Sequence, residues 1–570
     1  MKPPSPPAPP PPPRHVSFKK RSKPTLTKKL HELTKTTPAL AGVVVHKTNL
    51  GQGKRQVWIG VETSSQLRTT YAPPPPSTHL ATLPAPTHLE AHRAAVITKL
   101  RKKLIALCSK CNNASPPSLA FERWLFDCLL VEEMSPPHTT TVSDRNALQN
   151  EDDPLFGPLC RRTELENCSL VLDLTRATLS KSTSITIAQN LQRTAHEMMA
   201  VASSSSSASS TSSASSASSS SSSSSHSSSV VVVHHRHTLD IKYGRHGKRL
   251  LKLNNEHYRK MFDLWTLTKY GPSNAEDNNE ARDESNRNIF HDDLYVMLSR
   301  YFAMQGHGFQ AACPEHVFQV LHTALGVSFE CFASPLNCYF GAYCSAFPDV
   351  DQPFGSSGSF WKWKPPLEGG SFQANPPFVA IVMKHMALKI LQLLTSKGGG
   401  SSGGSGGGGI PSYEKPLSFV VVVPGWLEDE GYNLMSSSSS KRAHWLIAKE
   451  EHGFCDGAQH QRRDRFRSSP YDTAIFVLQN EAGALKWPVN TSVETELRRA
   501  FAAGVPTASA IARRKRDGRG FADEDGGGGV YKGKKKRRTG QGVVQRIKAE
   551  KKNGKKRKGK VWKKKKDQSR

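Results

Sequence analysis

The segment "GSFQANPPFVAIVMKHMALKILQLL", residues 370–394, decides the fold of this chain. Its first residues predict a short buried strand, and the apolar run from Val379 predicts a helix, so the segment reads strand, loop, helix. A turn would account for the two prolines of the loop. A turn does not require an asparagine before them and an aromatic residue behind them, as in Asn375-Pro376-Pro377-Phe378.

The segments on either side of it alternate in the same way. Continuous apolar stretches predict strands at 327–333, 417–426 and 473–480, and "CPEHVFQVLHTALG" predicts a helix that Gly326 ends. The stretch "SPLNCYFGAYCSAF", residues 334–347, looks helical. Buried strands that alternate with helices predict an α/β fold with a mostly parallel sheet that is covered on both faces.

A second region shows apolar residues at spacings of three and four, which is typical of amphipathic helices. It predicts helices at 91–108, 119–133, 182–202, 250–265 and 290–304. We therefore expect a helical domain in two parts, 86–202 and 230–300, around a serine-rich insertion at 203–229. The α/β domain would cover 301–495, with a glycine-rich insertion at 398–409.

The two flanks have the composition of disordered arms. Residues 1–85 are rich in Pro, Thr and Lys, and 496–570 form a basic tail. Residues 511–570 contain 25 Lys/Arg and 6 Asp/Glu, against a net charge of +31 for the whole chain. Such runs are typical of a nuclear-import signal or a polyphosphate-binding arm, and a solubilising tail is the alternative.

Other sequence features argue against several classes of protein. No apolar stretch reaches the roughly 20 residues of a membrane helix, and the first residues lack the apolar core of a signal peptide. The 10 cysteines are scattered, so we expect reduced thiols. "CSKC", Cys108 to Cys111, has no second ligand pair, so no metal site is expected.

The asparagine–proline loop suggests chemistry on an amine. The Asn375 side-chain oxygen and the Pro376 carbonyl can accept hydrogen bonds from one NH2 group, which makes its nitrogen more tetrahedral and more nucleophilic. Proline keeps the loop rigid, and Phe378 offers a face on which a base can stack. A purely structural turn is the alternative interpretation.

A methyl-donor site is expected at the end of the strand that begins at 327. The loop with Ser334, Pro335 and Asn337 would open a helix whose N-terminus holds the methionine carboxylate of S-adenosylmethionine. A plain helix capped by Ser334 is an equal interpretation. Asp349 or Asp351 would take the ribose hydroxyls, or both are ordinary loop carboxylates.

The segments "VSFECFASPLNCYFGAYCSAFPDVD", "GSFQANPPF", "VVVVPGW" and "TAIFVLQNEAGALKWP" closely resemble the phosphorylated-CTD-interacting factor family over about residues 238–490. Characterised members are cap-specific adenosine N6-methyltransferases. The resemblance implies a Rossmann-like class I methyltransferase domain packed with a helical domain and S-adenosylmethionine as donor, which Asn375 would also contact. The acceptor would be the first transcribed adenosine, in its 2′-O-methylated form or not, beside the 7-methylguanosine cap of nuclear mRNA.

The resemblance also assigns roles to residues. Asn375, Pro376, Pro377 and Phe378 would form the catalytic loop, and Trp426 with Glu428 would contact the cap. The candidates for the cap phosphates are Arg245, His452, His460 and Arg463, for which a solvated surface position is the alternative.

Two departures from the family pattern stand out. Animal members carry a WW domain that binds the phosphorylated polymerase tail, but here only Trp58 precedes Trp124, so recruitment to RNA polymerase II is in doubt. Val379 follows the loop where the family usually has acidic residues. A related N6-adenine or amide methyltransferase, or a weakly active scaffold that binds RNA or the transcription machinery, is therefore the alternative to a nuclear cap-adjacent enzyme.

Overall fold

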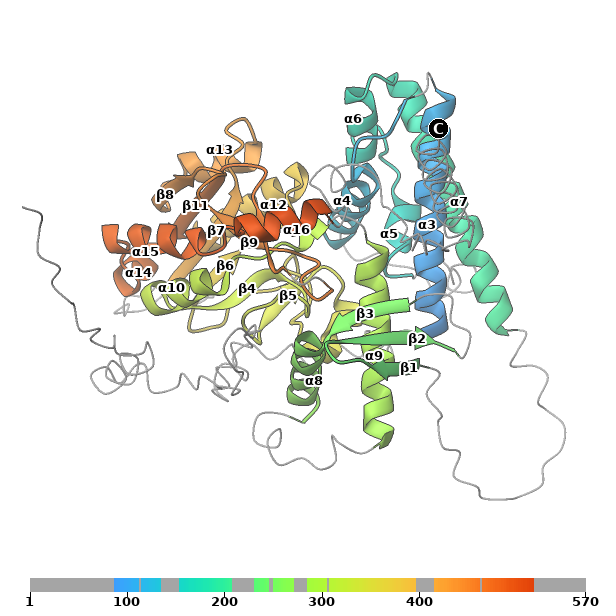
Figure 1. Ribbon diagram of the computed structural model, residues 1–570. Helices are drawn as coiled ribbons and strands as arrows, with labels where there is room; N and C mark the ends of the chain where they lie inside the picture. Colours follow the sequence, from blue (N-terminus) through green and yellow to red (C-terminus); the bar gives the residue numbers. More distant parts are fainter. Residues whose placement is uncertain are drawn as a thin grey trace, which may run out of the picture.

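The computed structural model describes residues 87–111, 114–134, 153–207, 230–244, 250–270, 284–304, 307–395, 415–461 and 464–516. An α/β part and a mainly helical part pack side by side (Figure 1). The predicted arm at 1–85, nearly all of the serine-rich insertion and the glycine-rich insertion lie outside the described residues.

Among the described residues, the central sheet has six strands in the order β5-β4-β6-β7-β11-β8. Their bounds are Val327–Ala333 (β4), Tyr343–Ser345 (β5), Gly370–Ala374 (β6), Leu417–Pro424 (β7), Lys441–Ile447 (β8) and Thr473–Gln479 (β11). The pairs β5–β4, β4–β6 and β6–β7 are parallel, whereas β11 runs antiparallel to both β7 and β8. The predicted α/β class is confirmed, and the sheet is mixed because β11 is reversed.

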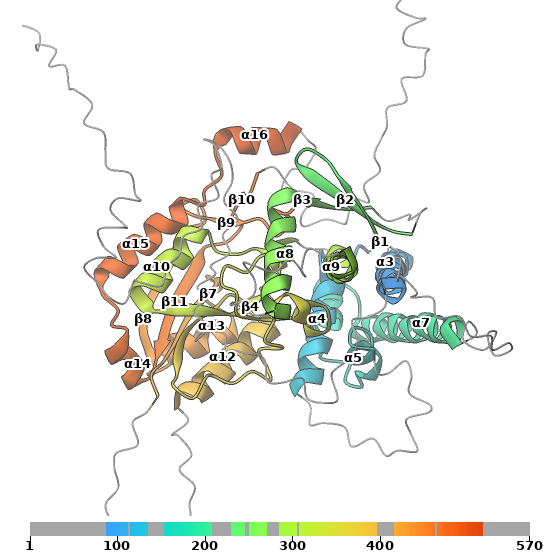
Figure 2. The same ribbon diagram turned by 90° about the horizontal axis from the view of Figure 1, so that it is seen from below.

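Helices cover both faces of this sheet, because its central strands are apolar on both sides. Every residue of β7 and β11 is buried. One face packs against α12 and α13, and the other packs against α10 and α15 (Figure 2). The helices of this part are α10 (Glu315–Leu325), α11 (Pro348–Asp351), α12 (Ala380–Thr395), α13 (Glu430–Ser437), α14 (Glu481–Lys486), α15 (Thr491–Ala502) and α16 (Ala508–Arg516), with 3-10 turns η4 (His307–Gln310) and η5 (Gln352–Phe354).

Gly326 ends α10 as predicted and turns the chain into β4. Its φ is 65°, in the left-handed region that glycine adopts at little cost. Its N–H donates to the carbonyls of Leu321 and His322. A Cβ atom there would also collide with the Trp487 ring, so both the conformation and the space require glycine.

The helical part has one apolar core and a small sheet of its own. Its helices are α3 (Thr87–Lys110), α4 (Ala120–Met134), α5 (Gly157–Arg161), α6 (Ser169–Arg176), α7 (Lys181–Ser207), α8 (Asn255–Tyr270) and α9 (Glu284–Ala303). The antiparallel strands β1 (Val230–His234), β2 (Thr238–Tyr243) and β3 (Leu250–Asn254) follow the serine-rich segment. A further short pair in the α/β part joins β9 (Gly453–Cys455) to β10 (Phe466–Ser468). The helical core also takes in residues 336–354, so the two parts share packing.

A buried ion cluster joins the parts. Arg300 of α9 donates to both carboxylate oxygens of Glu90 on α3, at 2.8 and 2.9 Å. It also donates to both oxygens of Asp349 on α11, at 3.1 and 2.8 Å. The Arg300 and Glu90 side chains are fully buried, so either charge without its partner would be costly in free energy. The cluster therefore fixes α11 against α3 and α9.

The prediction of a helix at 334–347 is wrong. A turn occupies 334–338, and residues 343–345 form β5, which pairs with β4. The reason is a buried side chain of β4. The Glu330 carboxylate accepts hydrogen bonds from the backbone N–H groups of Tyr339 and Phe340, at 2.6 and 3.0 Å, so these groups need no helix. Burial raises the pKa of Glu330 to about 7.

Other expectations are corrected in part. Residues 250–254 are a strand and not the start of a helix, because they pair with β2. Residues 491–502 and 508–516 are helical, so the part of the expected tail from 496 to 516 is mostly ordered. The helix α15 packs against the sheet through Val493, Leu497 and Phe501. The prediction missed this contact because the basic residues that follow made the whole segment look like a tail. In the described part of the chain no helix is long and apolar enough to cross a membrane.

Candidate functional site

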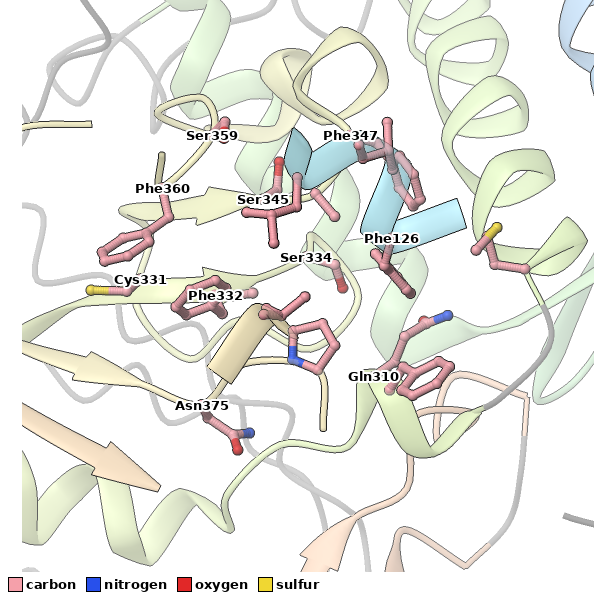
Figure 3. Close-up of a pocket in the computed structure, with 18 of the residues that line it drawn as sticks. Phe126, Gln310, Cys331, Phe332, Ser334, Ser345, Phe347, Ser359, Phe360 and Asn375 are labelled. Atoms are coloured by element: carbon pink, nitrogen blue, oxygen red, sulfur yellow. The ribbon is translucent and has the colours of Figure 1, made fainter. Parts of the chain in front are cut away.

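A cavity lies where the order of the strands in the sheet reverses. β5 follows β4 on one side of it, and β6 lies on its other side. The connections that leave the carboxyl ends of β4 and β6 therefore run in opposite directions along the sheet. Ligands of open α/β sheets bind at such a switch point. A cavity of about 110 Å³ lies there, and the ends of β4, β5 and β6 contribute to its lining (Figure 3).

Aromatic side chains from both parts contribute to the cavity wall. They are Phe126, Tyr301, Phe309, Phe332, Phe347, Phe360 and Trp361. Among the described lining residues, Glu133 carries the single carboxylate, and there is no Lys or Arg. A wall of this kind suits a flat, apolar or cationic ligand.

A half-buried lysine holds one side of this wall in place. Lys389 on α12 donates to the carbonyls of Phe360, Trp361 and Trp363, the last two at 2.9 and 2.8 Å. Burial lowers the pKa of Lys389 to about 8. The three bonds fix the loop that follows β5 against α12.

The asparagine of the predicted catalytic loop enters this cavity from the end of β6. The Asn375 Nδ2 group donates to the Ala311 carbonyl at 3.1 Å, which fixes the orientation of the amide. Its Oδ1 atom is buried and accepts no hydrogen bond from the described residues. Pro377 lines the cavity and Pro376 is buried. A buried acceptor without a partner is costly, so its presence in a cavity suggests a ligand that donates to it.

Phe378 and the cap candidate Trp426 lie in one aromatic cluster. The ring of Trp426 meets that of Phe378 edge-on at 6.5 Å and that of Tyr471 at 5.3 Å. Tyr471 is 43% exposed, and Glu428 is exposed two residues beyond Trp426. The three rings therefore lie at the same edge of the sheet as Asn375, with part of their surface open to solvent.

The predicted donor loop after β4 is a closed turn. The backbone N–H and the Oγ of Ser334 both donate to Asn337 Oδ1, at 2.7 and 2.9 Å. Asn337 Nδ2 donates to the Gln310 carbonyl at 3.0 Å, and the Pro335 carbonyl accepts from Cys338 Sγ. Ser334 and Asn337 line the cavity, but no helix N-terminus faces it here, so the expected dipole is missing.

The two predicted ribose ligands lie behind the cavity wall. Asp349 is bound to Arg300, and Asp351 is fully buried and accepts a 2.6 Å hydrogen bond from Tyr301. Burial raises the pKa of Asp351 to about 8. Neither carboxylate lines the cavity, so these contacts favour structural roles.

Two of the four predicted phosphate ligands, His452 and His460, are described, and both are buried. His452 is buried, and its ring nitrogens bond to the Ala448 carbonyl and Thr473 Oγ1, both at 2.7 Å. His460 is 5% exposed and its ring packs edge-on against His257 at 6.1 Å. Arg245 and Arg463 lie outside the described residues. For His452 the geometry favours a structural role.

The cavity contains polar residues that the sequence did not single out. Glu133 lies at the end of α4, and Gln310 ends the 3-10 turn η4. Both lie far along the chain from residues 370–378, and no motif surrounds either. Glu133 reaches the cavity because the helical part packs against the sheet, and Gln310 reaches it because residues 310 and 311 are bonded to the loops after β4 and β6.

The fold and the site thus define an α/β protein with a ligand cavity at the switch point of its sheet. Residues 260–457 match a family model described as "Phosphorylated CTD interacting factor 1 WW domain". The matched stretch runs from α8 to the residues just after β9, so it contains most of the α/β part.

Curated relatives agree with this match. The chain is 35% identical over 262 residues to a human protein and to a mouse protein, each named "mRNA (2'-O-methyladenosine-N(6)-)-methyltransferase". Each alignment covers 44% of this chain and 33% of the relative, so the chain spans about a third of the length of these relatives. Over part of its length this chain is therefore similar to the phosphorylated CTD interacting factor 1 family.

Proposed function

We propose that this protein is an S-adenosylmethionine-dependent methyltransferase that methylates N6 of the adenosine next to the mRNA cap. The observation that carries the proposal is the buried Asn375 Oδ1 atom, which lies at a sheet switch point and accepts no hydrogen bond from the described residues. The names of the human and mouse relatives support the acceptor. The strand order, with β4 between β5 and β6 and with β11 reversed, supports a Rossmann-like class I methyltransferase fold.

The residues of the cavity fit the methyl donor. S-adenosylmethionine supplies an electrophilic methyl group on a sulfonium ion, and aromatic faces such as that of Phe332 suit that charge, whereas the Phe360 ring already has Lys389 Nζ 4.8 Å from its centroid. The wall formed by Phe332, Phe360 and Trp361 would hold the donor and exclude water. Ser334 and Asn337 line the side next to β4, so we propose that they border the donor as well.

The catalytic loop would act on the target amine. Asn375 Oδ1 and the Pro376 carbonyl accept its two N–H groups, so its lone pair is directed at the methyl carbon. The new N–C bond forms as the S–C bond breaks, S-adenosylhomocysteine leaves, and the nitrogen then loses a proton to solvent. Phe378 would stack on the adenine.

The aromatic cluster at the sheet edge would bind the cap. A 7-methylguanine is cationic, and Trp426 offers a partly exposed ring with Glu428 two residues away. We propose that capped mRNA lies along this edge, that the basic tail adds nonspecific affinity, and that the protein acts in the nucleus. The phosphorylated tail of RNA polymerase II is a proposed partner, on the basis of the family alone.

A methyl-transfer assay tests the proposal. The purified chain is incubated with labelled S-adenosylmethionine and matched RNAs that begin with capped A, uncapped A or capped G. Label on capped A alone is expected. Label on uncapped A as well would indicate a relaxed N6-methyltransferase, and no label on any RNA would overturn the proposal.

A further inference from the structure

Gln310 places a second unpartnered oxygen in the cavity. The residue is 9% exposed, it lines the cavity, and its Oε1 atom accepts no hydrogen bond from the described residues. Gln310 and Asn375 lie on one side of the cavity, opposite Ser345 and Phe347 (Figure 3). A buried amide oxygen of this kind is costly unless a ligand donates to it.

The backbone around Gln310 is fixed to two strand ends. Its carbonyl accepts from Asn337 Nδ2 after β4, and the next carbonyl, that of Ala311, accepts from Asn375 Nδ2 after β6. Ala312 then pairs with Cys455 through two backbone hydrogen bonds of 3.2 and 2.8 Å. Residues 310–312 therefore bridge the switch point, and the Gln310 backbone is held between the loops that follow β4 and β6.

The position of Gln310 indicates which half of the donor it meets. In Rossmann-like sheets the ribose lies beyond the second strand, here β5, so the adenosine half would extend to that side. The methyl group must approach Asn375 at the end of β6. The methionine half then lies on the β4–β6 side, where Ser334 and Asn337 are engaged with each other and no helix N-terminus is present.

Resting on the proposed function, we propose that Gln310 Oε1 accepts a hydrogen bond from the α-ammonium group of the methionine half of the donor. An ammonium is a strong donor that needs acceptors, and the described lining offers no competing Lys or Arg. Gln310 is thus a binding residue for the amino-acid end of the cofactor.

Two ligands separate this role from others. S-adenosylhomocysteine keeps the α-ammonium, whereas 5′-methylthioadenosine lacks the whole amino-acid part. Calorimetric titration of each ligand is carried out with the full chain, with Gln310→Leu and with the control Gln319→Leu, which makes the same change on α10 away from the cavity. Loss of a hydrogen bond to a charged group predicts about 10- to 100-fold weaker binding of S-adenosylhomocysteine to Gln310→Leu. Binding of 5′-methylthioadenosine should change less than about twofold, which also shows that the site is folded.

Other results overturn the inference. An equal loss for both ligands, with an unchanged melting temperature, would assign Gln310 to the adenosine half. Unchanged affinity for both, with a raised KM for RNA, would assign it to the target nucleotide. If the unsubstituted chain binds neither ligand, the proposed function itself fails.

Discussion

Replacing Asn375 with alanine removes the acceptor on which the proposed reaction depends. The substitution deletes one hydrogen bond, from Nδ2 to the Ala311 carbonyl, whose net contribution to folding is about 1 kcal/mol. It also deletes the buried Oδ1 atom that has no partner among the described residues, which offsets part of that loss. We therefore expect the free energy of unfolding to fall by no more than about 1 kcal/mol.

The effect on catalysis should be much larger. Loss of one preorganised electrostatic contact to a reacting group typically lowers kcat by about 100- to 1,000-fold. Affinity for S-adenosylhomocysteine should change little, because that ligand has no target amine. Single-turnover methyl transfer to capped RNA measures the first quantity and calorimetry the second.

The control is Asn433→Ala, which removes the same side chain from an exposed position on α13. Activity of that variant should match the unsubstituted chain. If Asn375→Ala keeps more than a tenth of kcat while the control is normal, the loop does not supply the catalytic contact and the assignment is wrong.

Three further predictions concern the support of the site. Arg300→Ala removes the cation of Asp349 and one of the two cations of buried Glu90, which keeps Arg93, so denaturant titration should show a loss of about 3–5 kcal/mol, and a loss below 1 kcal/mol would contradict the cluster's role. The pKa of Asp351 is raised to about 8 by burial, so the folded state keeps a proton that the unfolded chain loses near pH 4. The stability that this carboxyl contributes is complete below pH 4 and falls as pH rises to about 8, and Asp351→Asn should flatten melting temperature over that window; an unchanged pH profile would refute this. Lys389→Met frees three backbone carbonyls behind the aromatic wall, and we expect about tenfold weaker binding of S-adenosylhomocysteine by calorimetry, whereas unchanged affinity would show that the wall holds without it.

The sequence by itself determined four strands of the central sheet, β4, β6, β7 and β11, and the place of the asparagine–proline loop after β6. Residues 417–424 and 473–479 are apolar without alternation, and such strands can only be buried on both faces, so an α/β sheet follows from local pattern. The asparagine–proline–proline–phenylalanine order was equally local, and its place at the end of β6 follows from the strand before it.

Only the tertiary structure decided how the cavity is completed. Residues 334–347 have a helix-like pattern of apolar residues. The carboxylate of Glu330 nevertheless accepts hydrogen bonds from the backbone N–H groups of Tyr339 and Phe340, and residues 343–345 form β5 by pairing with β4. Glu133 reaches the cavity because the helical part packs on the sheet, and Gln310 because residues 310 and 311 bond to the loops after β4 and β6. Contacts between residues so distant in sequence leave no local signal. Asp349 pairs with Arg300, and this pairing is also invisible in the local sequence. The arginine that neutralises Asp349 lies on another helix, α9.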